Sequence, residues 1–245
     1  MNSQLSAAIT LLPLLLLLLP NFHTALADPL AEFCNKDNAK LNPGSSSRLA
    51  KLLSQLVAKA PADGYYATSS GRGRNKVHGL AQCRGDAAAK DCSTCIADAA
   101  DQIARRCPGL PDGRIWYDNC FLRYSKANFV GKLGNNSPAV IFFNAENVTD
   151  PETFNAKLAG LEDVVRSQAV KPGSKGIGKG ETKLLPPSAE TIYAVVQCTR
   201  DLAAADCGRC LAAAAAGYFA DYCDNKKGCR ALLDGCYARY ELYPF

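Results

Sequence analysis

The stretch QCRGDAAAKDCSTC at residues 82–95 returns as QCTRDLAAADCGRC at residues 197–210. Both stretches follow the pattern Q-C-x2-D-x-A-A-x-D-C-x2-C, and they lie 115 residues apart. The correspondence continues to Cys120 and Cys236, which are 116 residues apart because the second copy holds one extra residue. A likeness of this length indicates an internal repeat, so we expect two copies of one domain.

Each copy is predicted to begin with an amphipathic helix. In the first copy, residues 45–47 are serines that can cap the helix, and apolar side chains follow at helical spacing: Leu49, Leu52, Leu53, Leu56 and Val57. In the second copy, Asp150 suits the capping position and Pro151 the first helical position. The predicted buried stripe of that helix is Phe154, Leu158, Leu161 and Val165.

The repeated motif is predicted to join a strand to a second helix. The strands are residues 77–83 and 192–198, and the helices begin near Asp91 and Asp206, whose carboxylates favour a helix N-terminus. The predicted buried faces are Cys92, Cys95, Ile96, Ala99 and Ile103 in the first copy, and Cys207, Cys210, Leu211, Ala214 and Tyr218 in the second.

Further strands are expected at 114–124 and 139–143 in the first copy and at 230–243 in the second. Together the elements predict an α+β fold in which helices cover one face of an antiparallel sheet. Residues 171–183 resemble a linker in composition, but the repeat places them inside the second copy. We therefore expect them, like residues 69–76, to form a mobile loop within a domain, with domains at 28–144 and 145–245.

Residues 1–27 are predicted to be a signal peptide, because an uncharged apolar run ends in small residues at 25–27. A retained membrane anchor is the alternative, although the run is shorter than a membrane span. No later segment suggests a membrane span. All 12 cysteines follow this leader, and an even number in an exported chain indicates disulfides.

Two sequons, at Asn147 and Asn135, are candidate glycosylation sites. The net charge of +5 is mild for a chain of this length and does not suggest a nucleic-acid partner. The expected product is therefore an exported, disulfide-bonded glycoprotein.

The doubled C-x8-C-x2-C motif, followed by single cysteines and a closing C-[FY]-x-R-Y, resembles the plant cysteine-rich repeat secretory proteins. Their unit is the stress-antifungal domain of ginkbilobin. The resemblance implies two tandem domains, each with two helices packed on a five-stranded antiparallel sheet and stapled by disulfides. The implied pairs are Cys34–Cys107, Cys83–Cys92, Cys95–Cys120, Cys198–Cys207 and Cys210–Cys236. The second copy has no counterpart of Cys34, so we expect Cys223 to pair locally with Cys229.

The resemblance also implies a mannose site. It consists of an asparagine after the first cysteine, an arginine six residues before the last cysteine and a glutamate five residues after it, a set of groups that can bind vicinal hydroxyls. The first copy has Asn35 and Arg114 but Ser125 in place of the acid, whereas the second has Arg230 and Glu241 but no Cys-Asn element. Neither copy holds the full set, and solvated strand residues are the alternative interpretation.

Enzymatic activity finds little support in the sequence. The part after the leader has one histidine, His78, with no nucleophile motif near it, and the CxxC pairs do not match zinc-ribbon spacing. We expect no cofactor, no metal and no catalytic residue. Two functions remain: a secreted apoplastic protein of stress or defence that binds mannose-type or fungal wall glycans, or an extracellular module that binds receptor-like kinase ectodomains. In both cases we expect the protein to be a monomer or a weak homo-oligomer.

Overall fold

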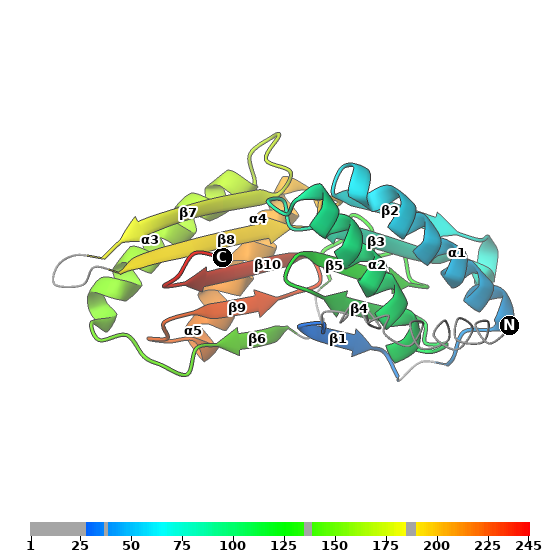
Figure 1. The fold of residues 1–245 in the computed structure, drawn as a ribbon, viewed down its shortest axis with the longest axis horizontal. Coiled ribbons are helices and arrows are strands. Elements are labelled where there is room, and N and C mark those ends of the chain that lie inside the picture. The colour runs from blue at the N-terminus through cyan, green and yellow to red at the C-terminus, as the bar shows by residue number, and fades with distance from the viewer. Residues whose placement is uncertain (1–27, 37–38, 135–138, 185–189) are drawn as a thin grey trace, which may run out of the picture.

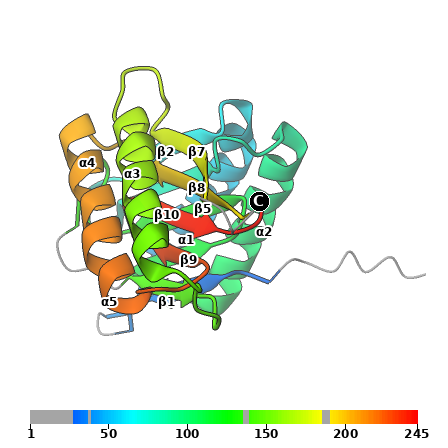
Figure 2. The same ribbon diagram turned by 90° about the vertical axis from the view of Figure 1, so that its left-hand side faces the viewer.

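The computed structural model describes residues 28–36, 39–134, 139–184 and 190–245. They form two five-stranded antiparallel sheets that lie side by side, each covered by helices (Figure 1). Turning the molecule shows that the helices of the two copies lie on opposite sides of it (Figure 2). The predicted α+β tandem fold is thereby confirmed. The predicted signal peptide, residues 1–27, and the sequon at Asn135 lie outside the described residues.

The first sheet has the strand order β1-β4-β5-β3-β2. Its strands are β1 (Ala31–Cys34), β2 (Tyr65–Ser70), β3 (Val77–Cys83), β4 (Asp112–Trp116) and β5 (Cys120–Ser125). Helices α1 (Pro43–Lys59) and α2 (Ala89–Arg106) cover it, and the short 3-10 turns η2 (Ala60–Ala62) and η3 (Gly73–Asn75) flank β2. The core between helices and sheet contains the leucines and isoleucines of the predicted stripes.

Helix α1 begins before its predicted serine cap. Its first residue is Pro43, and the Asn42 side chain accepts a hydrogen bond from the Ser45 N–H at 2.7 Å. Asparagine followed by proline is an equally good start signal, and Ser45 is instead buried within the first turn. In the second copy the predicted cap is confirmed, because Asp150 accepts from the Thr153 N–H at 3.2 Å.

The second sheet has the strand order β6-β9-β10-β8-β7. Its strands are β6 (Val140–Phe143), β7 (Ile177–Lys183), β8 (Thr191–Cys198), β9 (Cys229–Leu232) and β10 (Cys236–Glu241), and helix α3 (Pro151–Ala169) packs on it. Two expectations were wrong. Strand β6 pairs with β9 and belongs to the second sheet, so the sheets divide before residue 140. Residues 177–183 form an edge strand and not a loop, because their backbone pairs with β8 along its length.

The extra residue of the second copy is absorbed inside its second helix. This helix runs as α4 (Ala204–Ala212), the π-helical segment η4 (Ala213–Phe219) and α5 (Ala220–Tyr222). It starts and ends at the counterparts of the ends of α2, and a π-helical turn accommodates one added residue without moving them. The insertion shifts the stripe, so Phe219, and not Tyr218, takes the buried place of Ile103.

Six disulfides staple the described residues, and they match the expected pairs: Cys34–Cys107, Cys83–Cys92, Cys95–Cys120, Cys198–Cys207, Cys210–Cys236 and Cys223–Cys229. A buried tyrosine adds a second tether in each copy. The Tyr124 hydroxyl lies 3.1 Å from the Leu110 carbonyl, and the Tyr240 hydroxyl lies 3.1 Å from the Lys226 carbonyl. Each tyrosine thus ties the last strand to the loop after the second helix.

The glutamine that opens each repeated stretch joins the two copies. Gln82 donates from Nε2 to the Cys198 carbonyl at 2.9 Å, and its Oε1 accepts from the Arg200 N–H at 2.9 Å. Gln197 donates in the same way to the Cys83 carbonyl at 3.3 Å. Both glutamines are buried, so each satisfies its amide on the backbone of the other copy. This exchange relates the copies by an approximate two-fold axis.

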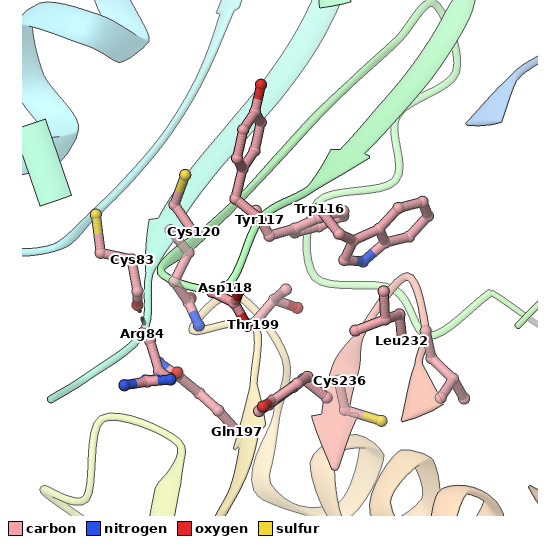
Figure 3. A pocket seen from close by; sticks show the side chains of 14 residues that line it. Cys83, Arg84, Trp116, Tyr117, Asp118, Cys120, Gln197, Thr199, Leu232 and Cys236 are labelled. Carbon is pink, nitrogen blue, oxygen red and sulfur yellow. Dashed lines mark hydrogen bonds between the residues drawn. The ribbon is translucent and has the colours of Figure 1, made fainter. Parts of the chain in front are cut away.

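Beside these glutamines lies a cavity of about 50 Å³ between the copies. Trp116 of the first copy and Leu232 of the second both line it (Figure 3). Trp116 is 3% exposed and stacks on Phe121 with ring centroids 5.2 Å apart. Ligand pockets usually measure about 300–1,000 Å³, so this space is too small for a ligand of ordinary size. Trp116 therefore acts at the interface and offers no exposed platform for a sugar ring.

Candidate functional site

The four candidate sugar-binding residues lie in two separate places. Asn35 follows β1 and Arg114 lies on the neighbouring strand β4, both in the first copy. Arg230 lies on β9 and Glu241 ends β10, both in the second copy. The sequence therefore points to two half-sites, and the structure decides what surrounds each of them.

The half-site of the first copy is closed. Arg114 is 6% exposed and lies under the Phe33 ring, with its guanidinium carbon 4.6 Å from the ring centroid. Its guanidinium is 3.2 Å from the Asp112 carboxylate and 2.8 Å from that of Asp234 in the second copy. With both carboxylates engaged and the ring above, little of Arg114 remains for a ligand. Asp112 faces Ser125 across the ladder, so an acid on the adjacent strand contacts Arg114 where Ser125 cannot.

The half-site of the second copy borders a pocket, although the side chains of Arg230 and Glu241 are only 12% and 11% exposed. A pocket of about 300 Å³ is lined by Asn144, Arg230 and Glu241 together. Asn144 follows β6 and donates its backbone N–H to the Gly228 carbonyl at 2.9 Å, just as Asn35 follows β1 and donates to the Asp112 carbonyl at 3.1 Å. Asn144 is thus the counterpart of Asn35. The second copy has no Cys-Asn element, as the sequence indicates, but the strand pairing places an asparagine at the same position.

A cysteine that changed strands explains why sequence reasoning missed Asn144. In the first copy Cys34 on β1 faces Gly113 on β4, and in the second copy Phe143 on β6 faces Cys229 on β9. The cysteine has moved to the facing position on the neighbouring strand, where it still reaches the end of the second helix. The Cys-Asn pair therefore became Phe143-Asn144. The signal available in the sequence was an asparagine directly after an apolar strand.

Two contacts hold the charged groups of the pocket in place. Glu241 accepts from Arg239 Nε at 3.0 Å, and Arg230 Nη1 lies 2.7 Å from the Asp118 carboxylate of the first copy. Gly228 leaves room for the Glu241 carboxylate, because a Cβ there would overlap this group, lie 2.8 Å from its Cδ and displace it. The pocket thus presents an anchored cation, an anchored anion and an amide, which together can donate to and accept from adjacent hydroxyls.

Aromatic side chains form the rim of the pocket. Phe143 and Tyr243 are 54% and 50% exposed, and Phe142, which faces Arg230 across the ladder, is 41% exposed. Leu30 of the first copy also lines the pocket. Exposed apolar rings beside fixed polar groups are typical of a binding surface and not of an ordinary solvated strand.

A family model described as salt stress response/antifungal matches residues 33–127 and again residues 143–243. The chain belongs to this stress-antifungal family. Cysteine-rich repeat secretory protein 55 of Arabidopsis thaliana is 49% identical over 227 residues, which cover 89% of this chain and 84% of that protein. The antimicrobial ginkbilobin-2-like protein of Castanea crenata is 37% identical over 220 residues, which cover 89% of this chain and 89% of that protein.

The chain is also similar to receptor-like proteins. Cysteine-rich receptor-like protein kinase 25 of Arabidopsis thaliana is 32% identical over 255 residues, but the match spans 37% of that protein. The solved tandem DUF26 ectodomain of the Arabidopsis thaliana cysteine-rich receptor-like protein PDLP8 has a TM-score of 0.74 and 25% identity, covering 88% of this chain and 98% of that one. The proteins that resemble this chain thus include secretory proteins and the ectodomain of a receptor-like protein.

Other candidate features do not form a second site in this stress-antifungal protein. His78 lies on β3, and burial, with Lys76 and Lys132 nearby, lowers its pKa. Within the described ranges, no cluster of three or more histidine, cysteine or acidic side chains could hold a metal ion. None of the helices among these residues is long and apolar enough to cross a membrane. Asn147 is exposed, so its side chain is accessible to a glycosylating enzyme.

Proposed function

We propose that this chain is a secreted, non-enzymatic plant protein of stress or defence that binds a mannose-type glycan in the pocket of its second copy. The observation that supports the proposal is the convergence of Asn144, Arg230 and Glu241 on one pocket of about 300 Å³. The names of the relatives support the setting, since they include secretory and antimicrobial proteins.

The chemistry of the pocket suits a hexose. The guanidinium of Arg230 offers several N–H donors in one plane, the carboxylate of Glu241 accepts, and the amide of Asn144 can do both. Adjacent sugar hydroxyls need such paired donors and acceptors at fixed positions. The exposed rings of Phe143 and Tyr243 can pack against the apolar C–H face of a sugar while its hydroxyls bind the polar groups.

Titration calorimetry with mannose and short mannose oligosaccharides tests the proposal. The two structurally equivalent asparagines provide a matched pair of variants: Asn144→Ala should weaken binding at least about tenfold, whereas Asn35→Ala should leave it unchanged. Arg230→Ala should abolish it. All variants should carry Thr149→Ala, which removes the sequon at Asn147 and with it any glycan attached there. Binding that survives Asn144→Ala, or no binding by the wild type, contradicts the proposal.

A receptor-binding role is the second candidate. The ectodomain of a receptor-like protein shares the tandem fold at a TM-score of 0.74, and three aromatic side chains stand exposed around the pocket. In this case the pocket rim would contact a receptor ectodomain. Surface plasmon resonance against such ectodomains would then show binding that Phe143→Ala weakens and that added mannose does not compete.

A further inference from the structure

Each copy carries an aspartate two residues before its last cysteine, at the turn that connects its last two strands. In the first copy this residue is Asp118, and its carboxylate reaches into the second copy. It lies 2.7 Å from Arg230 Nη1 and 3.9 Å from Arg239 Nη1. Arg230 lines the candidate pocket, so a residue of one copy contacts the site of the other.

The second copy returns the contact. Asp234 lies 2.8 Å from Arg114 Nη1 and 3.2 Å from Arg123 Nη1 of the first copy. The reciprocal contacts differ in exposure: the side chain of Asp234 is 4% exposed, and that of Asp118 is 56% exposed. The contact that closes the first half-site is buried, whereas the one beside the open pocket borders solvent.

Arg230 and Glu241, which carry opposite charges, line the same pocket. Each is paired with a different residue, so neither charge is paired with the other. Arg239 engages the Glu241 carboxylate through Nε at 3.0 Å, and Asp118 engages Arg230. If Asp118 lost its charge, Glu241 would compete for the guanidinium of Arg230, because both line the same pocket. Direct pairing of the two would use the groups that a ligand needs.

We propose that Asp118 is a positioning residue of the pocket: from the first copy, it fixes the guanidinium plane of Arg230 so that the free N–H groups face a ligand in the second. This inference rests on the proposed glycan site and extends it. The functional unit is then the tandem pair, because the second copy obtains part of its site from the first.

Asp63 offers a matched control for this proposal. Its carboxylate also crosses between the copies, 2.7 Å from Arg200 Nη2, and its side chain is 57% exposed, but it does not line the pocket. The variants Asp118→Asn and Asp63→Asn therefore each remove one half-exposed carboxylate from an arginine of the other copy. Mannose affinity by calorimetry and melting temperature should be measured for both, with Asp118→Glu as the conservative variant.

We expect Asp118→Asn to weaken mannose binding about tenfold, Asp63→Asn to leave it within twofold, and Asp118→Glu to recover most of the affinity. Equal losses in the two asparagine variants would mean general loosening between the copies and would overturn the proposal. Unchanged binding by Asp118→Asn would overturn it while leaving the glycan site intact. If the wild-type protein binds neither mannose nor a related glycan, the proposed function is wrong, and this inference is wrong with it.

Discussion

Two counterpart disulfides should contribute unequally to stability. Cys34–Cys107 joins residues 73 apart, whereas Cys223–Cys229 joins residues only 6 apart, because the cysteine moved to the neighbouring strand in the second copy. A cross-link stabilises mainly by restricting the unfolded chain, and the effect grows with the logarithm of loop length. The loop-entropy relation gives about 4.4 kcal/mol for the long loop and about 2.2 kcal/mol for the short one at 25 °C.

The variant with Cys34→Ala and Cys107→Ala should therefore be less stable than the variant with Cys223→Ala and Cys229→Ala, by about 2.2 kcal/mol in free energy of unfolding. Guanidinium denaturation followed by far-ultraviolet circular dichroism measures the loss, and fluorescence of Trp116, the single tryptophan, reports on β4 and on its contact with the second copy. Equal losses, or a larger loss for the short loop, would refute the entropic reasoning and assign the stabilisation to contacts in the folded state.

Three other predictions follow from buried groups. Burial raises the pKa of the Glu162 carboxyl from 4.5 to about 7, so the folded state binds the proton more tightly than the unfolded state does. The free energy of unfolding should therefore fall as the pH rises from 4.5 to about 7, by at most about 1.4 kcal/mol per pH unit. Glu162→Gln should flatten this dependence in urea midpoints compared at pH 5 and 8, and an unchanged slope would contradict the assignment. Tyr124→Phe and Tyr240→Phe should each cost about 1–3 kcal/mol in thermal unfolding, because the buried Leu110 carbonyl and the partly buried Lys226 carbonyl each lose a donor. A cost near zero would mean that water replaces the hydroxyl. Gly228→Ala should displace the Glu241 carboxylate and weaken mannose binding at least about tenfold by calorimetry, and unaltered affinity would show that Glu241 is dispensable.

Local patterns predicted the elements that local forces specify. The helical stripe through Leu49, Leu52 and Leu56, and the strand that ends at Cys83, agree with the structure because side-chain period and turn signals act within a few residues. Strand β7 was missed because Gly178 and Gly180 lower its intrinsic strand preference, while pairing with β8 stabilises it. Pairing partners lie far apart in the sequence, so its composition does not reveal them.

The site was half predictable for the same reason. Arg230 and Glu241 keep fixed distances from Cys236, so the repeat located them directly. Asn144 has no such anchor, because its cysteine moved to β9, and only the register between β6 and β9 identifies it as the counterpart of Asn35. The aspartate of the interface did leave a signal, since both copies have one two residues before the last cysteine, but its contacts depend on how the copies pack.

Fusion of the copies into one chain changes what mutation can do to their shared interface. In a symmetric homodimer of identical domains, every substitution would appear twice and alter both arginine clusters at once. Here a change near Arg114 leaves Arg230 untouched, so one cluster could become a closed structural joint while the other kept an open pocket. In a tandem chain the two copies can therefore take different functions while the contacts between them are kept.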